Sequence, residues 1–227
     1  MATAKPASSP VRRRDTRAQE RGERTRALVI EETIHCIREE GFAAASTRHI
    51  IDRAGVSWGV IQYYFGDRDG LLTAVIEHAN TTLTASLNRI ADTAAEVSDP
   101  QQRAESLAEA AWEVFFSPTC MTALEILIAT RAMQGTLGAD QLEGVVAGIA
   151  RIADAVGDST PHAVGIANLL WSSPVGMMVA QMVTSDPLPT ATEQTALAAL
   201  IGEHLEVGQR QASSKAASKA RPRRASR

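Results

Sequence analysis

Residues 41–72 contain the feature that most narrows the possible folds, namely two short helical segments separated by a tight turn at Gly55. Ser46 or Thr47 can cap the first helix and Ser57 can cap the second, because their hydroxyl oxygens accept hydrogen bonds from the free N–H groups of a first helical turn. A second helix of about eight residues would be roughly 12 Å long, about the width of a DNA major groove. The stretch is therefore predicted to be a helix-turn-helix motif.

The same stretch holds five of the nine aromatic residues in the chain. Because only 4% of all residues are aromatic, core packing alone does not explain why so many gather on two short helices. Aromatic, hydroxyl and arginine side chains on an outward-facing helix suit the base edges and phosphates of double-stranded DNA, so we expect this segment to bind it. The five aromatics are Phe42, Trp58, Tyr63, Tyr64 and Phe65.

The rest of the chain shows helical spacing of its apolar residues and no strand-like alternation, which predicts an all-α fold of about nine helices. Ala27, Ile30, Ile34 and Ile37 fall on one face of a helix that ends at Gly41. Asp67 is placed to cap a long fourth helix. Five more helices are expected near residues 101–116, 119–134, 138–157, 161–183 and 190–209.

The two ends of the chain are basic and the body between them is acidic. Residues 1–26 contain eight Lys or Arg and three Asp or Glu, residues 207–227 contain seven and none, and residues 27–206 contain eight and 23. The acidic body would repel DNA, so any contact with a duplex must be confined to a basic edge. Both ends have the composition of disordered, solubilising tails, although the N-terminal one is equally suited to contact phosphates or the minor groove.

The sequence contains no motif of an enzyme, a metal site or a cofactor site. It has no glycine-rich phosphate loop, no nucleophile elbow and no HExxH, and its five histidines are scattered. His35 and Glu39 are four residues apart on a helix, which is typical of a surface pair. We therefore expect no catalytic residue, no metal and no cofactor.

The compartment is predicted to be the cytoplasm. Cys36 and Cys120 offer one possible pair and no CxxC spacing, which fits a reducing environment. The most apolar segment, residues 169–183, is interrupted by Pro174 and polar residues and falls short of a membrane span, so we expect no membrane contact.

The helix-turn-helix stretch resembles the N-terminal domain of TetR-type transcriptional regulators over about 60 residues. That resemblance implies a homodimer, two recognition helices on successive major grooves of a palindrome, and a C-terminal domain that binds a small-molecule effector. Repression is the usual mode in such proteins. The resemblance rests on residue type and spacing at Gly41-Phe42, Thr47-Arg48, Ala54-Gly55-Val56-Ser57, Gly59, Tyr64-Phe65 and Leu71-Leu72.

These observations together divide the chain into four regions. They are a disordered basic arm over residues 1–20, a DNA-binding domain over 21–83 with its motif at 46–65, a helical effector-binding and dimerisation domain over 84–210, and a disordered basic tail over 211–227.

The resemblance implies a role in DNA binding for ten residues of the motif. Thr47 and Ser57 would grip phosphate at helix N-termini, and Arg48 would reach a phosphate or a guanine edge. Trp58 and Val60 would face the bases, where apolar groups favour thymine methyls. The full set is Thr47, Arg48, Ser57, Trp58, Gly59, Val60, Gln62, Tyr63, Tyr64 and Arg68.

Two positions depart from the usual pattern of the family. Gln62 stands where Tyr is usual and could read adenine, and Arg68 stands where Lys is usual, which keeps the charge and changes its geometry. Gly59 would let the backbone approach DNA, while the Tyr63 and Tyr64 hydroxyls would donate to phosphates. Core packing is an equal alternative for Tyr64, it is the expected role of Phe65, and a partner interface is an alternative for Trp58.

The C-terminal half has two candidate sites. Effector-pocket candidates, each of which could instead be core filler, are Trp112, Phe115, Phe116, Met121, Glu125, Met133, Trp171, Met177 and Met182. Glu125 would meet a cationic ligand, or else face solvent or pair with Arg131 or Arg89. Dimer-interface candidates for a four-helix seam, with packing in the internal core as the alternative, are Leu170, Val175, Met178, Leu197, Leu200, Ile201 and Leu205.

A different class of function is also compatible with the charge pattern. An architectural protein could bind duplex DNA non-specifically through its basic tails. Competition with random DNA distinguishes the two functions, because a regulator retains one palindromic site and a tail-driven binder does not.

Overall fold

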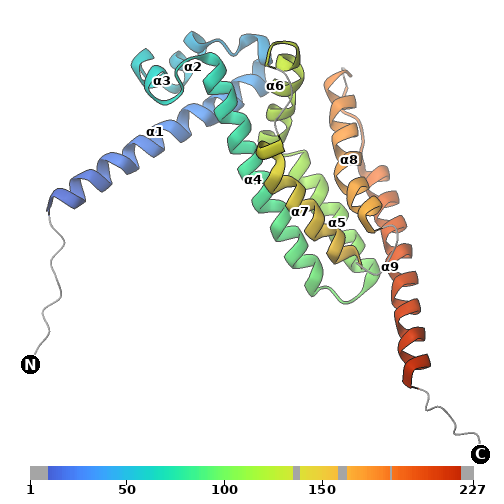
Figure 1. Ribbon diagram of the computed structural model, residues 1–227. Coiled ribbons are helices and arrows are strands. Elements are labelled where there is room, and N and C mark those ends of the chain that lie inside the picture. Colours follow the sequence, from blue (N-terminus) through green and yellow to red (C-terminus); the bar gives the residue numbers. More distant parts are fainter. Residues whose placement is uncertain (1–9, 135–138, 158–162, 185, 221–227) are drawn as a thin grey trace, which may run out of the picture. The chain divides into compact units, whose positions relative to one another are not determined.

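The computed structural model describes residues 10–134, 139–157, 163–184 and 186–220 (Figure 1). Within these ranges the chain forms nine α-helices, one short 3₁₀-helix and no strand, which confirms the all-α prediction. The elements are α1 (Pro10–Glu40), η1 (Phe42–Ala44), α2 (Thr47–Ala54), α3 (Trp58–Tyr64), α4 (Arg68–Glu96), α5 (Pro100–Phe115), α6 (Pro118–Gln134), α7 (Ala139–Gly157), α8 (Ala163–Met182) and α9 (Ala191–Ala220).

Both terminal helices extend into segments for which the sequence predicts disorder. α1 begins at Pro10, inside residues 1–20, and α9 ends at Ala220, inside residues 211–227. The two segments lack apolar residues for packing, but they are rich in Ala, Arg, Lys and Gln, which favour helices. A low apolar content therefore predicts that these ends are not buried in a core. It does not predict that they are not helical.

The chain forms two compact units. The first comprises residues up to Ile76 together with Glu125–Thr130 from α6, and the second comprises Glu77–Leu124 and the residues from Arg131 onward. The sequence-based boundary lies seven residues later, at 83/84. α4 and α6 each contribute residues to both units.

The first unit has a small core built from four helices. Of the apolar stripe predicted on α1, Ile30, Ile34 and Ile37 are buried and Ala27 is exposed. The other buried residues of this core include Val29 of α1, Ile50 of α2, Ile61 of α3, and Leu71, Leu72 and Val75 of α4.

The turns around α3 follow from local sequence. Gly55 ends α2 in the left-handed conformation with φ 63°, which residues with a side chain rarely adopt. Asp67 Oδ1 accepts a hydrogen bond from the Gly70 N–H at 2.8 Å, as the predicted cap of α4 requires. A Cβ at Gly70 would lie 1.9 Å from the carbonyl oxygen of Phe65, so the start of α4 sits directly against the end of α3.

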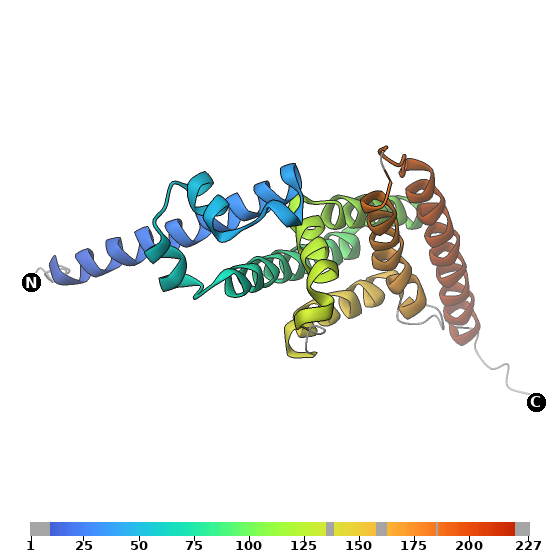
Figure 2. The same cartoon turned by 90° about the horizontal axis from the view of Figure 1, so that it is seen from above.

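The second unit is a helical bundle. α9 packs against α5, and Figure 2 shows α9 beside α8. Buried residues of α4, α5, α7, α8 and α9 share one apolar core. A Cβ at Gly148 of α7 would lie 2.8 Å from Cβ of Leu87 on α4, so this glycine permits close approach of the two helices.

α8 is the described helix whose length and apolar composition would suit a membrane span. The interruption at Pro174 does not end this 20-residue helix. The same length and composition occur in core helices, and Ala167, Leu170 and Met178 of α8 are buried within the bundle.

Candidate nucleic-acid interface

α3 has one buried and one exposed side. Ile61 is fully buried in the first unit, whereas Trp58 is 55% exposed and Tyr63 is 81% exposed. Gly59 and Gln62 are exposed as well. Seven residues at 1.5 Å each make a helix of about 10 Å, which fits lengthwise across a major groove. The outward side of α3 therefore offers aromatic, amide and backbone groups to a partner.

Two serines precede the helices of the motif and are used differently. The Ser46 hydroxyl accepts a hydrogen bond from the His49 N–H at 3.3 Å and so caps α2. The exposed Ser57 side chain makes no capping hydrogen bond to any described residue, which leaves its hydroxyl available. Thr47 is half-buried as the first residue of α2, and Arg48 beside it is exposed.

The two tyrosines of α3 point in different directions. A Cβ at Gly22 of α1 would lie 2.6 Å from the Tyr64 hydroxyl oxygen, so Tyr64 packs closely on α1. Tyr63 meets Tyr64 edge-on, with ring centroids 4.8 Å apart, and remains exposed. Phe65 lies under the guanidinium of Arg26, 5.7 Å from its ring centroid. These contacts favour the packing role for Tyr64 and Phe65, and the outward role for Tyr63.

Arg68 holds the loop before α2 in place. Its Nε–H donates to the carbonyl oxygen of Ala45 at 2.8 Å, and its guanidinium lies 4.7 Å from the ring centroid of Phe42. The resemblance predicts that Arg68 contacts DNA. In the structure its planar group donates to the carbonyl oxygens of Phe42 and Ala45 and stacks on an aromatic face, which Arg does better than Lys. Val60 is half-buried.

An ion cluster that the sequence analysis missed joins α1 to α2. Arg53 of α2 donates to Glu40 at 2.6 Å and to Glu39 at 2.8 Å, and His49 Nε2 lies 2.9 Å from Glu40. The hydrogen bond from His49, followed by that from Arg53, holds the pKa of Glu40 below its ordinary value. The hydrogen bond to Glu39 raises the pKa of Arg53.

Comparison with known proteins agrees with this geometry. Residues 29–75, which span the end of α1, the whole motif and the start of α4, match the family of bacterial regulatory proteins called tetR. These residues form a TetR-type helix-turn-helix domain.

Two curated relatives match this chain over 64 residues each. The HTH-type transcriptional regulator BetI of Paraburkholderia phytofirmans is 39% identical over 64 residues, which are 28% of this chain and 33% of that protein. BetI of Burkholderia mallei is 38% identical over the same length and the same shares. The match thus spans about a third of the length of these relatives.

Solved structures extend the likeness of fold to the second unit. A putative TetR-family transcriptional regulator from Mesorhizobium loti has a TM-score of 0.60 and 16% identity, covering 82% of this chain and 96% of that one. A TetR-family transcriptional regulator from Pectobacterium atrosepticum has a TM-score of 0.51 and 21% identity, covering 83% and 93%. At these identities the likeness concerns the fold alone.

Beyond the TetR-type domain, the predicted effector residues are mostly packed in the core. Trp112 and Phe115 are buried, and Phe115 and Trp171 line a cavity of only about 10 Å³, room for at most one water molecule. Trp171 Nε1 donates to Asn168 Oδ1 at 3.1 Å. Phe116, Met121, Met177 and Met182 are half-buried, and the side chain of Met133 lies outside the described residues.

Glu125 belongs to the first unit. Its Oε1 accepts a hydrogen bond from the Phe42 N–H at 2.9 Å, 83 residues away in sequence. The sequence predicts that Glu125 contacts a ligand, solvent, Arg131 or Arg89, and the contact with Phe42 is a different one. Sequence spacing carries no signal for it, because only tertiary folding brings α6 to η1.

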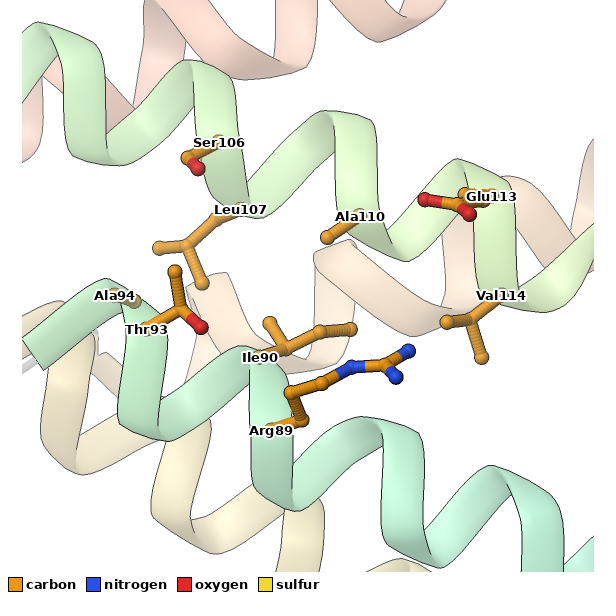
Figure 3. A pocket seen from close by; sticks show the side chains of 9 residues that line it. All are labelled: Arg89, Ile90, Thr93, Ala94, Ser106, Leu107, Ala110, Glu113 and Val114. Carbon is orange, nitrogen blue, oxygen red and sulfur yellow. The ribbon is translucent and has the colours of Figure 1, made fainter.

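An open groove of about 320 Å³ lies between α4 and α5 of the second unit (Figure 3). It contains none of the predicted effector residues. Arg89 of α4 and Glu113 of α5 bring opposite charges to it, and Ile90, Leu107 and Val114 supply apolar surface.

Most of the residues predicted at the dimer interface are buried inside the second unit. Leu170, Met178, Leu197, Ile201 and Leu205 are buried in the second unit, and Val175 is half-buried. Of the set, Leu200 alone is exposed, at 62%. α8 is apolar on nearly all sides, so its sequence does not distinguish the core-facing stripe from the outward one.

Proposed function

We propose that the protein is a ligand-responsive transcriptional repressor that binds a palindromic operator as a homodimer. The observation that carries this proposal is the outward side of α3. Trp58 is 55% exposed and Tyr63 is 81% exposed. Burial of aromatic surface stabilises a protein by on the order of 25 cal/mol per Å², and the fold does not gain this stabilisation from the exposed parts of the two rings. Contact with the edges and backbone of DNA would recover it.

The exposed groups suit both phosphates and bases. The free Ser57 hydroxyl, Arg48 and Tyr63 are placed to hold phosphates, and Trp58 is placed to meet thymine methyls. Gln62 can pair with adenine. Arg17, Arg21 and Arg24 on α1 are also exposed and would add phosphate contacts.

The dimer would form through the outward stripe of α8 and α9. Leu169, Gly176 and Val179 of α8 are exposed and follow intervals of seven and three residues, the spacing of a helix seam, and the exposed Val183 comes directly after the helix. A Cβ at Gly176 would meet nothing within 4 Å, so a second copy could approach closely there. Leu200 and Val207 of α9, seven residues apart, are a second exposed apolar pair. A second copy is the partner for which these aliphatic side chains are suited.

An effector would bind within the second unit. The buried Trp112 Nε1–H has no hydrogen-bond partner among the described residues, which favours a ligand that carries an acceptor. The surrounding core would have to open to admit it. The α4–α5 groove is a second candidate location, because Arg89 and Glu113 would recognise a zwitterionic or charged effector.

Selection of bound fragments from genomic DNA, followed by fluorescence anisotropy at 50 and 200 mM salt, tests the proposal. We expect one palindromic site that survives excess random DNA, with affinity falling more than about tenfold over that salt range. Arg48→Ala should weaken binding, whereas deletion of residues 1–9 and 221–227 should leave the preference for the palindrome. Loss of preference on deletion would instead favour a non-specific architectural protein.

A further inference from the structure

Three chemically distinct donor groups meet where α1 contacts α2. Cys36 and Glu40 lie one turn apart on α1, and His49 lies on α2. The Cys36 Sγ, a Glu40 carboxylate oxygen and a His49 ring nitrogen all lie within 4.8 Å of one another. Sequence spacing predicts no metal site, since His49 reaches the other two only through the packing of α2 on α1.

We propose that Cys36, Glu40 and His49 form a binding site for a divalent transition metal ion of the zinc class. Thiolate, imidazole and carboxylate are ligands that Zn²⁺ accepts, and three of them leave a fourth position for water. Bonds of about 2.0–2.3 Å place tetrahedral ligand atoms roughly 3.3–3.8 Å apart, so closing the site requires side-chain movement on the order of 1 Å. Mg²⁺ and Ca²⁺ prefer all-oxygen sites and are excluded.

The charges around the cluster favour a cation. The carboxylates of Glu32, Glu39 and Glu40 surround the guanidinium of Arg53, at 3.6, 2.8 and 2.6 Å respectively. Three negative groups against one positive group leave excess negative charge beside Cys36. A divalent ion would offset that excess.

Cys36 is fully buried, and burial followed by the charge of Glu40 raises the pKa of its thiol. A bound metal ion reverses this local balance, because it stabilises the thiolate directly and displaces the proton to solvent. Binding should therefore release a proton from the thiol and tighten as pH rises.

Arg53 competes with the metal ion for the carboxylate of Glu40. When the ion binds Glu40, the ion pair between Arg53 and Glu40 is lost, and Arg53 keeps its ion pairs with Glu39 and Glu32. Removal of this positive charge should therefore strengthen metal binding, a direction that simple damage to the α1–α2 contact would not produce.

Titration of the full-length, metal-free, reduced protein with Co²⁺ tests the site directly. We expect a thiolate-to-cobalt charge-transfer band that Zn²⁺ abolishes and Mg²⁺ does not. Cys36→Ser should remove the band, and His49→Gln, a change at a partly exposed side chain, should weaken Co²⁺ binding at least about tenfold. Circular dichroism verifies that each variant is folded.

Two matched controls separate this site from its surroundings. Cys120→Ser and His35→Gln replace the other cysteine and a neighbouring histidine, and both should keep the band unchanged. Absence of a charge-transfer band in the wild type, its persistence in Cys36→Ser, or its loss in Cys120→Ser would overturn the proposal.

Competition with a chromophoric zinc chelator measures the role of Arg53. Arg53→Gln should bind Zn²⁺ several-fold more tightly than the wild type, and Arg38→Gln, which removes the same charge from an exposed position of α1, should bind it as the wild type does. Equal changes in the two variants would show that only the net charge of the domain matters, and the site as proposed would be wrong.

Discussion

The two units expose large side chains of different chemistry. On α3 of the first unit the exposed groups are an indole, a phenol and an amide, each with a polar atom as well as an apolar surface. On α8 and α9 of the second unit they are aliphatic, as at Val164 and Leu200. An exposed surface with polar atoms suits a wet, charged partner such as DNA, whereas an aliphatic one suits another apolar protein surface. The exposure of a large side chain alone does not indicate which kind of partner it binds. The polar atoms of the exposed side chain indicate whether that partner is polar or apolar.

The largest expected effect tests the buried side of α3. Ile61→Ala should destabilise the first unit by about 2–5 kcal/mol, because it removes a fully buried side chain and leaves a cavity. Chemical denaturation followed by tryptophan fluorescence and circular dichroism measures the loss. Val60→Ala, at a half-buried neighbour, should cost less than half as much.

The aliphatic surface of α9 provides the next test. If the protein dimerises as proposed, Leu200→Arg should give monomers, because a charge would be buried at the proposed seam. Operator affinity should then fall by about 100-fold as one of two recognition helices is lost. Sedimentation velocity and anisotropy measure the two changes. Thr195→Arg, also exposed on α9, should remain dimeric; a monomer there would show that α9 tolerates no added charge.

The polar side of α3 should respond without loss of stability. Tyr63→Phe removes one hydroxyl from an exposed ring and should weaken operator binding about three- to tenfold, the value of roughly one hydrogen bond. Its thermal midpoint should stay that of the wild type. Tyr64→Phe, beside it but packed on α1, should affect binding less, and the opposite order would reverse the assignment of the two rings.

The smallest expected effect concerns pH. The depressed pKa of Glu40 means that its ionised form stabilises the fold at pH values above the ordinary carboxyl pKa of 4.5, and that this contribution is lost as pH falls through the lower, folded value. Thermal unfolding between pH 6 and pH 3 should show a slightly shallower pH dependence for Glu40→Gln. Glu31→Gln, at an exposed position of the same helix, should follow the wild type.

Sequence reasoning succeeds for the parts of the molecule that local chemistry determines. The turn at Gly55 and the cap at Asp67 depend on residues within a few positions, so the rules for turns and helix caps predict them. The residues that carry the family resemblance are also close together in the sequence. The type of domain could therefore be predicted from the sequence as well.

The contacts that the sequence does not predict are made by residues whose environment is set by distant parts of the chain. Arg68 contacts a carbonyl 23 residues earlier, and Glu125 contacts an N–H 83 residues earlier. For Leu170 and Ile201 the sequence leaves a dimer seam and the internal core as alternatives, because both faces of their helices are similarly apolar, and both residues are buried in the bundle. The cluster of Cys36, Glu40 and His49 could not be predicted from the sequence for the same reason, because its residues come from two helices.

The contact between Gly22 and Tyr64 reverses a familiar rule of protein engineering. Replacing a glycine within a helix by alanine normally gains about 1 kcal/mol of helical preference. At Gly22 the added methyl would lie 2.6 Å from the phenol oxygen, so the Tyr64 side chain or α1 would have to shift. That shift would offset part of the gain in helical preference, so Gly22→Ala should stabilise the chain less than the same change elsewhere in an exposed helix.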